Sequence, residues 1–226
     1  MYLENVVIDA LEPQRLGTFW EDAVGGDRLT DEPDIVETRL AVDGGPVLDL
    51  CFQQVSEPPA GSPRLHLVLA GDAARLEALG AQQVDGPALA DPEGNPCGVV
   101  VATAAYAGSG PLAALRLESA DPDRDAAFWS WLTGWSAVDG DSPRSLRHPS
   151  GLGPVLELVP EAGAKDGKNR RHLDVRLEAG EDADAVAAAI TERGGRELDT
   201  SDWGELPWRT YLDPSGNELC VLPASS

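Results

Sequence analysis

The chain has 226 residues and a net charge of −22, with 39 acidic against 17 basic side chains. A surface this acidic repels phosphate backbones and anionic headgroups, because both are bound by clustered Lys and Arg, so we expect no nucleic acid and no membrane as partner. The 42% of apolar and 25% of charged residues are typical of a folded globular protein and exclude general disorder. The length suits one large domain or two of ordinary size.

The acidic residues are spread along the chain rather than grouped in a tail. Residues 1–108 carry a net charge of −13 and residues 109–226 one of −9, which indicates a solubility feature. The three cysteines, Cys51, Cys97 and Cys220, are far apart and odd in number, so we predict free thiols and no disulfide framework. No stretch has the pattern of a signal peptide or of a membrane-spanning helix, and we expect a cytoplasmic protein.

The predicted elements of the first half follow the spacing of its apolar residues. A strand is expected over 5–10, and Pro13 suits the first turn of a helix whose apolar stripe runs to Gly25-Gly26. A second helix is expected over 72–79, ended by Gly80. Short runs rich in Val, Ile, Leu and Thr predict further strands. These strands lie at 35–42, 46–55, 65–69 and 97–103.

The second half repeats this order of elements. Before each Phe-Trp pair stands a similar strand and turn, NVVIDALEP at 5–13 and AALRLESADP at 113–122. Three more blocks match in the same order: GPVLDL (45–50) with GPVLEL (153–158), RLHLVL (64–69) with RRHLDVRL (170–177), and DPEGN (91–95) with DPSGN (213–217). Four matches in one order indicate an internal duplication.

The duplication predicts two domains, each built from two βαβββ units. The linker TAAYAGSGP at 103–111 has the Gly, Ser and Pro content of a boundary, so we divide the chain into residues 1–108 and 109–226. We interpret the two DPxGN blocks as tight structural turns, in which glycine supplies a positive φ.

One segment, residues 195–211, has no counterpart in the first half. It contains Trp203 and Trp208, whose amphipathic rings suit the wall of a ligand cavity. An extra segment of this kind can line or cover a cavity, so the second half is the preferred place for binding or chemistry.

The chain resembles the vicinal oxygen chelate superfamily, specifically its glyoxalase-like or bleomycin-resistance-like domains. The marks are the D/E-P turn before a Phe-Trp helix, the His-Leu start of a strand, the helix ending in LGA at 79–81, and D-P-x-G-N before the final strand. The resemblance implies an α+β fold of two tandem glyoxalase-like domains, each with curved mixed sheets forming a cup. In metal-dependent members it also implies His, Gln or Glu ligands that face into the cup.

The positions that correspond to those ligands are only partly filled by metal-binding residues. In the first half they are Asn5, Asp49, His66 and Gly98, and in the second half Ala114, Glu157, His172 and Cys220. Glu157, His172 and Cys220 could form an N/O/S site, because imidazole and thiolate both suit zinc. The alternative interpretation of His66 and His172 is that each ring packs at a strand start and is hydrogen-bonded locally.

The sequence leaves two hypotheses of function. The first is a protein that binds an unknown small molecule in an apolar cup, without a cofactor or a complete metal site; its candidate ligand-binding residues are Trp203, Trp208, His172 and Glu157. The second is a metal-dependent lyase, isomerase or dioxygenase that uses the second half, with zinc, nickel, iron or manganese held by Glu157, His172 and Cys220. No catalytic residue is assigned. In both cases we expect a monomer with paired domains or a homodimer.

Overall fold

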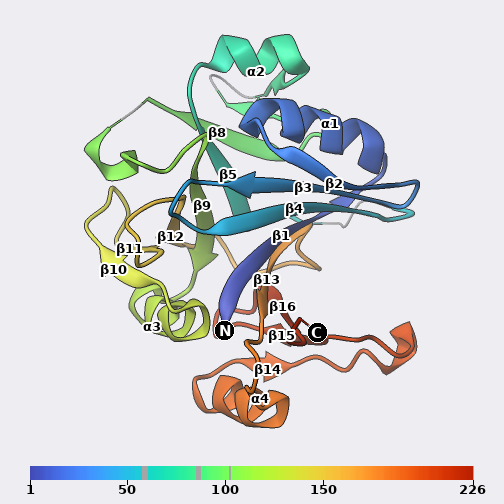
Figure 1. Cartoon of the computed structure of the whole chain (residues 1–226), viewed down its shortest axis with the longest axis vertical. Coiled ribbons are helices and arrows are strands. Elements are labelled where there is room, and N and C mark those ends of the chain that lie inside the picture. Colours follow the sequence, from blue (N-terminus) through green and yellow to red (C-terminus); the bar gives the residue numbers. More distant parts are fainter. Residues whose placement is uncertain (58–60, 85–87, 102, 226) are drawn as a thin grey trace.

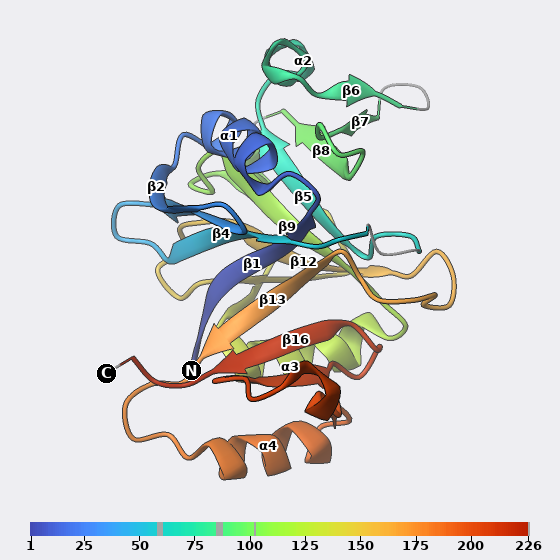
Figure 2. The ribbon, with the colours of Figure 1, turned by 90° about the vertical axis from the view of Figure 1, so that its right-hand side faces the viewer.

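The computed structural model describes residues 1–57, 61–84, 88–101 and 103–225. Within these ranges, sixteen strands form two eight-stranded sheets, and four α-helices cover them (Figures 1 and 2). The repeated strand and helix order confirms the predicted α+β fold. The strand expected over 97–103 corresponds to β8, Pro96–Val100, and residue 102 lies outside the described residues.

The first sheet, sheet A, has the strand order β14-β15-β16-β13-β1-β4-β3-β2. Its strands are β1 (Tyr2–Ala10), β2 (Asp27–Glu32), β3 (Ile35–Ala41), β4 (Val47–Gln54), β13 (Arg171–Arg176), β14 (Arg196–Glu197), β15 (Arg209–Leu212) and β16 (Glu218–Leu222). The helices that belong to these units are α1 (Pro13–Val24) and α4 (Ala183–Glu192), and a 3-10 turn, η2 (Ser201–Trp203), lies in the extra segment.

The second sheet, sheet B, has the order β10-β11-β12-β9-β5-β8-β7-β6. Its strands are β5 (Leu65–Ala70), β6 (Gln82–Gln83), β7 (Leu89–Ala90), β8, β9 (Leu112–Ser119), β10 (Ser136–Val138), β11 (Arg144–Arg147) and β12 (Val155–Pro160). Its helices are α2 (Ala73–Leu79) and α3 (Pro122–Thr133), and the linker forms a 3-10 turn, η1 (Ala104–Tyr106).

Each sheet combines one unit from each half of the sequence. In sheet A, β1 pairs antiparallel with β13, so that Val7 lies opposite His172. In sheet B, β5 pairs with β9, so that His66 lies opposite Arg116. Figure 2 shows β1 and β13 side by side. The four predicted units are present, but the strand pairing crosses the sequence boundary at residue 108, and the division into 1–108 and 109–226 stays a prediction.

Strand alternation separates the core of sheet A from its other face. Successive side chains of a strand point to opposite faces of the sheet, so one strand can contribute residues both to the core and to the opposite face. On β1, Val6 and Ile8 are buried in the same core as Leu16 and Trp20 of α1. The alternate residue Val7 faces the opposite side of the sheet, where the cavity described below lies. The helix α1 ends where the glycine pair predicted, with Gly25 in the left-handed conformation at φ 68°.

The Phe-Trp helices and the DPxGN turns are joined by hydrogen bonds. The indole Nε1 of Trp20 donates to Oδ2 of Asp91 at 3.2 Å, and that of Trp129 donates to Oδ2 of Asp213 at the same distance. All four side chains are buried. The predicted structural role of the turns is confirmed, because in each half the aspartate of the turn accepts the hydrogen bond of the buried indole N–H.

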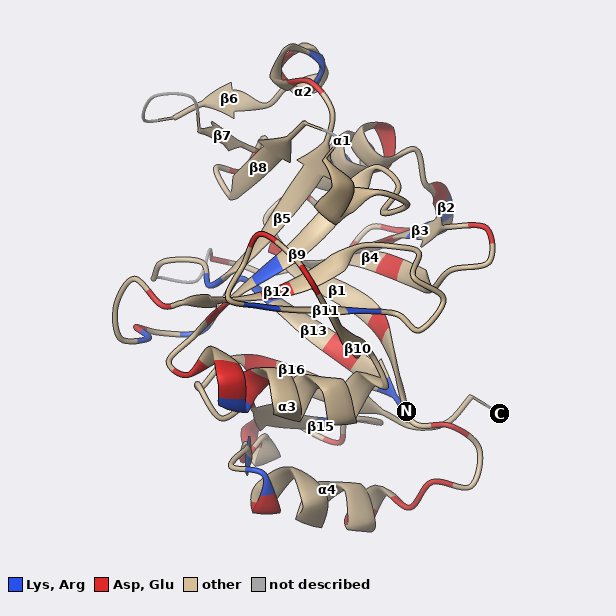
Figure 3. Cartoon of the chain, turned by 90° about the vertical axis from the view of Figure 1, so that its left-hand side faces the viewer, with Lys and Arg blue, Asp and Glu red and all other residues tan. Residues whose placement is uncertain are grey.

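The charges match the composition, with Asp and Glu spread over helices, strands and loops of both halves (Figure 3). All three cysteines are free, as predicted, and all three are buried. Among the helices of the described residues, none has both the length and the apolar character that crossing a membrane requires.

Candidate functional site

A cavity of about 1010 Å³ lies on the face of sheet A that points away from α1. This volume is at the upper end of the range for small-molecule sites, about 300 to 1,000 Å³. Its floor is formed by alternate residues of β1, β4, β13 and β16, and part of its wall by the segment 198–208. Trp203 and Trp208 both line the cavity, where the extra segment was expected to place them.

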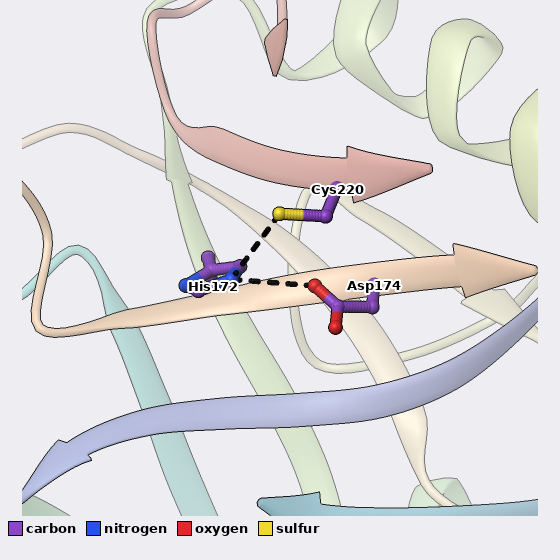
Figure 4. Close-up of side chains that lie close together, drawn as sticks. All are labelled: His172, Asp174 and Cys220. Atoms are coloured by element: carbon purple, nitrogen blue, oxygen red, sulfur yellow. Dashed lines mark hydrogen bonds and ion pairs between the residues drawn. The ribbon is translucent and has the colours of Figure 1, made fainter. Parts of the chain in front are cut away.

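Three side chains of types that can ligate a metal meet on the floor of this cavity (Figure 4). His172 and Asp174 are two residues apart on β13, so strand alternation points them to the same face. Cys220 on β16 is the register partner of Asp174. The Nε2 atom of His172 lies 3.3 Å from Oδ1 of Asp174 and 3.6 Å from Sγ of Cys220. The ligand atoms of all three lie within 4.8 Å of one another.

Neighbouring polar groups hold two of these side chains in place. Asn5 on β1 donates from Nδ2 to Oδ2 of Asp174 at 3.3 Å, and Oγ1 of Thr210 lies 3.7 Å from Sγ of Cys220. Within the described part of the chain, Oδ1 of Asp174 and Nδ1 of His172 are buried without a hydrogen-bond partner. A buried carboxylate oxygen that faces an imidazole nitrogen and a sulfur, and has no donor of its own, fits the coordination of a cation.

The surroundings of His172 raise the pKa of its imidazole ring. Burial lowers the pKa of this imidazole, but the neighbouring Asp174 carboxylate and Cys220 sulfur outweigh burial and raise the pKa from 6.5 to about 10. The equivalent ring of the other sheet, His66, has its pKa lowered by burial and by Arg171, against a contact of 3.4 Å with Glu118. The two equivalent histidines thus lie in opposite electrostatic environments, and positive charge is favoured at His172.

The remaining charges of the cavity are largely paired. The chain has only two lysines, and both line the cavity. Lys165 contacts Glu218 at 2.6 Å, and Lys168 forms an ion pair with Asp9. Asp9 and Glu218 also line the cavity, so these cations are neutralised by the acids beside them.

Glu157 lies on the other sheet, away from His172 and Cys220. Its carboxylate is fully buried on β12 and accepts hydrogen bonds from the Tyr106 hydroxyl at 2.7 Å and from Nε of Arg116 at 2.8 Å. The structure therefore brings together His172 and Cys220 of the predicted set, and puts Asp174 in the place expected for Glu157. The sequence carried a signal for Asp174, because the aspartate two residues after His172 shares its strand face.

Strand pairing across the halves explains this regrouping. The sequence analysis sorted the ligand positions by half, but each sheet takes one unit from each half. Sheet A therefore holds Asn5, Asp49, His172 and Cys220, and sheet B holds Ala114, Glu157, His66 and Gly98. Asp49 is bound through both carboxylate oxygens by Arg39, at 2.9 and 2.7 Å, and it is not part of the cluster.

The comparisons with known proteins agree with the fold. The family model of the glyoxalase-like domain matches residues 5–100 and again residues 114–222. Glyoxalase I from Zea mays is similar in structure, with a TM-score of 0.64 and 18% identity over 98% of this chain and 92% of that one. A putative dioxygenase from Bacillus subtilis has a TM-score of 0.60 and 15% identity over 100% of this chain and 86% of the other. No curated protein matches significantly.

At these identities the solved structures establish the fold and not the reaction. The family model covers most of the chain in two successive matches, which agree with the duplication and with the paired units of the two sheets. The chain belongs to the glyoxalase-like domain family of the vicinal oxygen chelate superfamily, with two copies of the domain in tandem.

Proposed function

We propose that the protein binds a small organic molecule in the cavity of sheet A. The observation that carries the proposal is the cavity itself, about 1010 Å³ in volume and walled by Trp203 and Trp208 of the segment found in one half alone. Amphipathic rings supply apolar contact area while remaining at the edge of solvent. Trp203 is 56% exposed and lines the cavity, so part of its ring is open to contact with a ligand.

The charges of the cavity favour a neutral or cationic ligand. Five acidic side chains line it, against three Lys and Arg side chains: Asp9, Asp34, Glu37, Asp174 and Glu218 against Lys165, Lys168 and Arg176. Both lysines are already paired with acids of the cavity, and Arg176 forms an ion pair with Glu4. An anionic ligand would meet the uncompensated acids in a partly desolvated space.

Binding of matched probes tests the proposal. Aromatic compounds of one size in neutral, cationic and anionic form are titrated while tryptophan fluorescence and the melting temperature are recorded. We expect the neutral or cationic members to quench fluorescence and raise the melting temperature. Trp203→Ala and Trp208→Ala should weaken binding at least about 10-fold, the loss of one good aromatic contact. Trp131→Ala is the matched control, because Trp131 packs against Arg193 outside the cavity.

Two results would contradict this function. One is a preference for the anionic probe, and the other is equal loss of binding in Trp131→Ala and Trp208→Ala.

We also propose, from the sequence, a cytoplasmic protein. Because β1–β13 and β5–β9 pair within one chain, we propose a monomer with paired domains over a homodimer.

A second candidate function is a metal-dependent lyase, isomerase or dioxygenase. The observation that favours it is the cluster of nitrogen, oxygen and sulfur donors at the cavity floor. His172, Asp174 and Cys220 would hold the ion, and a divalent ion bound there would act as a Lewis acid toward ligand oxygens. The chain's own groups would orient the ligand between the tryptophans and limit access of water. Turnover of a bound probe that is abolished by a chelator and restored by metal would select this candidate over simple binding.

A further inference from the structure

We propose that sheet B carries a second binding site, suited to a phenol, which the linker between the two halves fills with its own side chain, Tyr106. The inference goes beyond the proposed function, because it concerns the opposite sheet and neither needs nor excludes a ligand in the cavity of sheet A. It implies that the duplicated chain has one open ligand site and one site closed by a tethered group.

Corresponding positions of the two sheets differ in size and polarity. In sheet A, Asp174 of β13 is the register partner of Cys220 of β16, and both line the open cavity. In sheet B the corresponding pair is Val68 of β5 and Gly98 of β8, since Asp174 and Val68 each lie two residues after the histidine of their strand. Small apolar residues in sheet B therefore leave room where sheet A presents polar groups.

The Tyr106 ring occupies this room. It is 6% exposed and packs in a cluster with Val68, Ala114 and Val155. The cluster lies on the face of sheet B opposite to the leucines of the main core, because successive side chains of a strand point to opposite faces. An aromatic ring thus lies on the face of sheet B that corresponds to the open face of sheet A.

A buried carboxylate recognises the hydroxyl at the end of this ring. Glu157 is fully buried, its Oε1 accepts from the Tyr106 hydroxyl at 2.7 Å, and its Oε2 accepts from Nε of Arg116 at 2.8 Å. A buried carboxylate needs donors at its oxygens, so a ring that replaces Tyr106 must itself donate a hydrogen bond to Oε1. An aromatic ring with one O–H donor at its end is a phenol.

The linker is held to sheet B mainly through this one side chain. Tyr106 is the one buried residue within 103–108, all of which the structure describes. Its backbone N–H donates to the Thr103 carbonyl at 3.2 Å, inside the same turn, and the Gly108 carbonyl accepts from Gly153 at 3.0 Å. A side chain that anchors an otherwise exposed segment in a pocket is in the position of a tethered ligand.

Packing alone explains the ring but not the carboxylate beneath it. Burial of a charged pair costs free energy, and an apolar residue at position 157 would complete the same packing without that cost. The Arg116 side chain is 35% exposed, so the pair extends from the buried end of the ring toward solvent. Apolar walls with a few placed polar groups are typical of a ligand site.

Removal of the ring tests the site. Tyr106→Ala should bind p-cresol, the tyrosine side chain as a free molecule, at one more site per chain than the parent protein, and p-cresol should raise its melting temperature. Toluene, which lacks the hydroxyl, should bind there at least about 10-fold more weakly, because Oε1 of Glu157 is left without that donor. Calorimetry on both proteins measures the difference, in which binding to the cavity of sheet A cancels.

Two variants assign the preference to the carboxylate. Glu157→Gln in the Tyr106→Ala background should lower the preference for p-cresol over toluene, because a neutral acceptor replaces a charged one. Ala107→Gly loosens the same exposed turn but leaves the ring in place, so it should bind no additional p-cresol. Circular dichroism establishes that each variant is folded.

The parent protein provides a test that needs no variant to fold. A tethered group acts at an effective concentration of the order of millimolar, so about 20 mM p-cresol should displace Tyr106 and speed hydrogen exchange of the linker residues 103–110. Exchange of α4 should stay unchanged, which controls for general loosening. An unchanged linker, or equal binding of p-cresol and toluene by Tyr106→Ala, overturns the site and leaves Tyr106 a packing residue. Neither result affects binding in the cavity of sheet A, so the two proposals fail separately.

Discussion

Tyr106 of the linker donates a hydrogen bond of 2.7 Å to the buried carboxylate of Glu157 on sheet B. Its ring packs in a cluster with Val68, Ala114 and Val155. Glu157 lies beside Arg116 of β9, which in turn lies opposite His66 of β5. The segment that joins the two halves therefore fills space over sheet B, whereas the extra segment of the second half borders a cavity over sheet A.

Removal of the Tyr106 hydroxyl should destabilise the protein. Tyr106→Phe removes the hydroxyl that, together with Nε of Arg116, donates to the buried carboxylate of Glu157, so we expect the free energy of unfolding to fall by about 1.5 to 3 kcal/mol. Tyr2→Phe, on a residue 39% exposed, should change it by less than about 0.5 kcal/mol. Urea denaturation of the two variants measures the difference, and equal losses would contradict the assigned role of the hydroxyl.

The effect of Tyr106 should also depend on pH. Burial and the bond to Glu157 raise the pKa of this phenol from 10 to about 12. A pKa raised by folding stabilises the protein below the unfolded pKa, and this stabilisation is lost as pH rises through the folded pKa. The difference between the parent and Tyr106→Phe should therefore be constant from pH 7 to 9 and shrink between pH 10 and 12. A difference that grows above pH 10 would contradict this assignment.

Arg171 ties the second half to the first through a buried ion pair. It is 1% exposed, lies 3.3 Å from Asp91 and donates to the Pro96 carbonyl at 2.9 Å. Arg171→Met should cost about 3 to 5 kcal/mol, because Asp91 is left buried without its cation. In an Asp91→Asn background the same change should cost less, and a purely additive double-mutant cycle would argue against the pair. Arg193→Met, on an exposed arginine, is the control and should cost at most about 1 kcal/mol.

The thiols of Cys51 and Cys97 should resist alkylation in the folded protein. Burial raises the pKa of both, that of Cys97 to about 11, and at pH 8 about one Cys97 thiol in a thousand is ionised. Iodoacetamide labelling followed by peptide mass spectrometry should modify both residues slowly in buffer and rapidly in urea. The rate at Cys97 should rise with each pH unit up to about 11; equal rates in buffer and urea at pH 8 would refute protection by burial.

A side chain at the glycine of a DPxGN turn should destabilise the protein through the backbone conformation. Gly94 has φ 81°, and an added Cβ would meet no atom within 4 Å, so the cost of Gly94→Ala is a backbone cost of about 1 to 2 kcal/mol. Gly163 is equally uncrowded and has no positive φ, so Gly163→Ala should leave stability unchanged or raise it by up to about 1 kcal/mol. Thermal unfolding of the two variants separates the cost of the backbone conformation from that of side-chain contacts. Equal melting temperatures would contradict a cost caused by the positive φ of Gly94.

Much of the fold was predictable because its signals are local. Apolar spacing gave α1 and its end at Gly25, and the matched blocks gave the duplication. The Phe-Trp and DPxGN blocks recur together because Trp20 bonds to Asp91 in one repeat and Trp129 to Asp213 in the other. On α3, Trp129 is fully buried, whereas Trp131 is only half-buried and lies under Arg193 at 4.2 Å.

The sequence by itself determined the duplication, the main helices and strands, and the family, because all of these follow from local pattern and repetition. Tertiary structure decided which polar side chains meet. Each curved sheet is completed by pairing a strand of one half with a strand of the other, and no local pattern encodes that long-range choice. Pairing β1 with β13 joins Asn5 to His172, Asp174 and Cys220 around the cavity, and leaves Glu157 with Tyr106 on the opposite sheet.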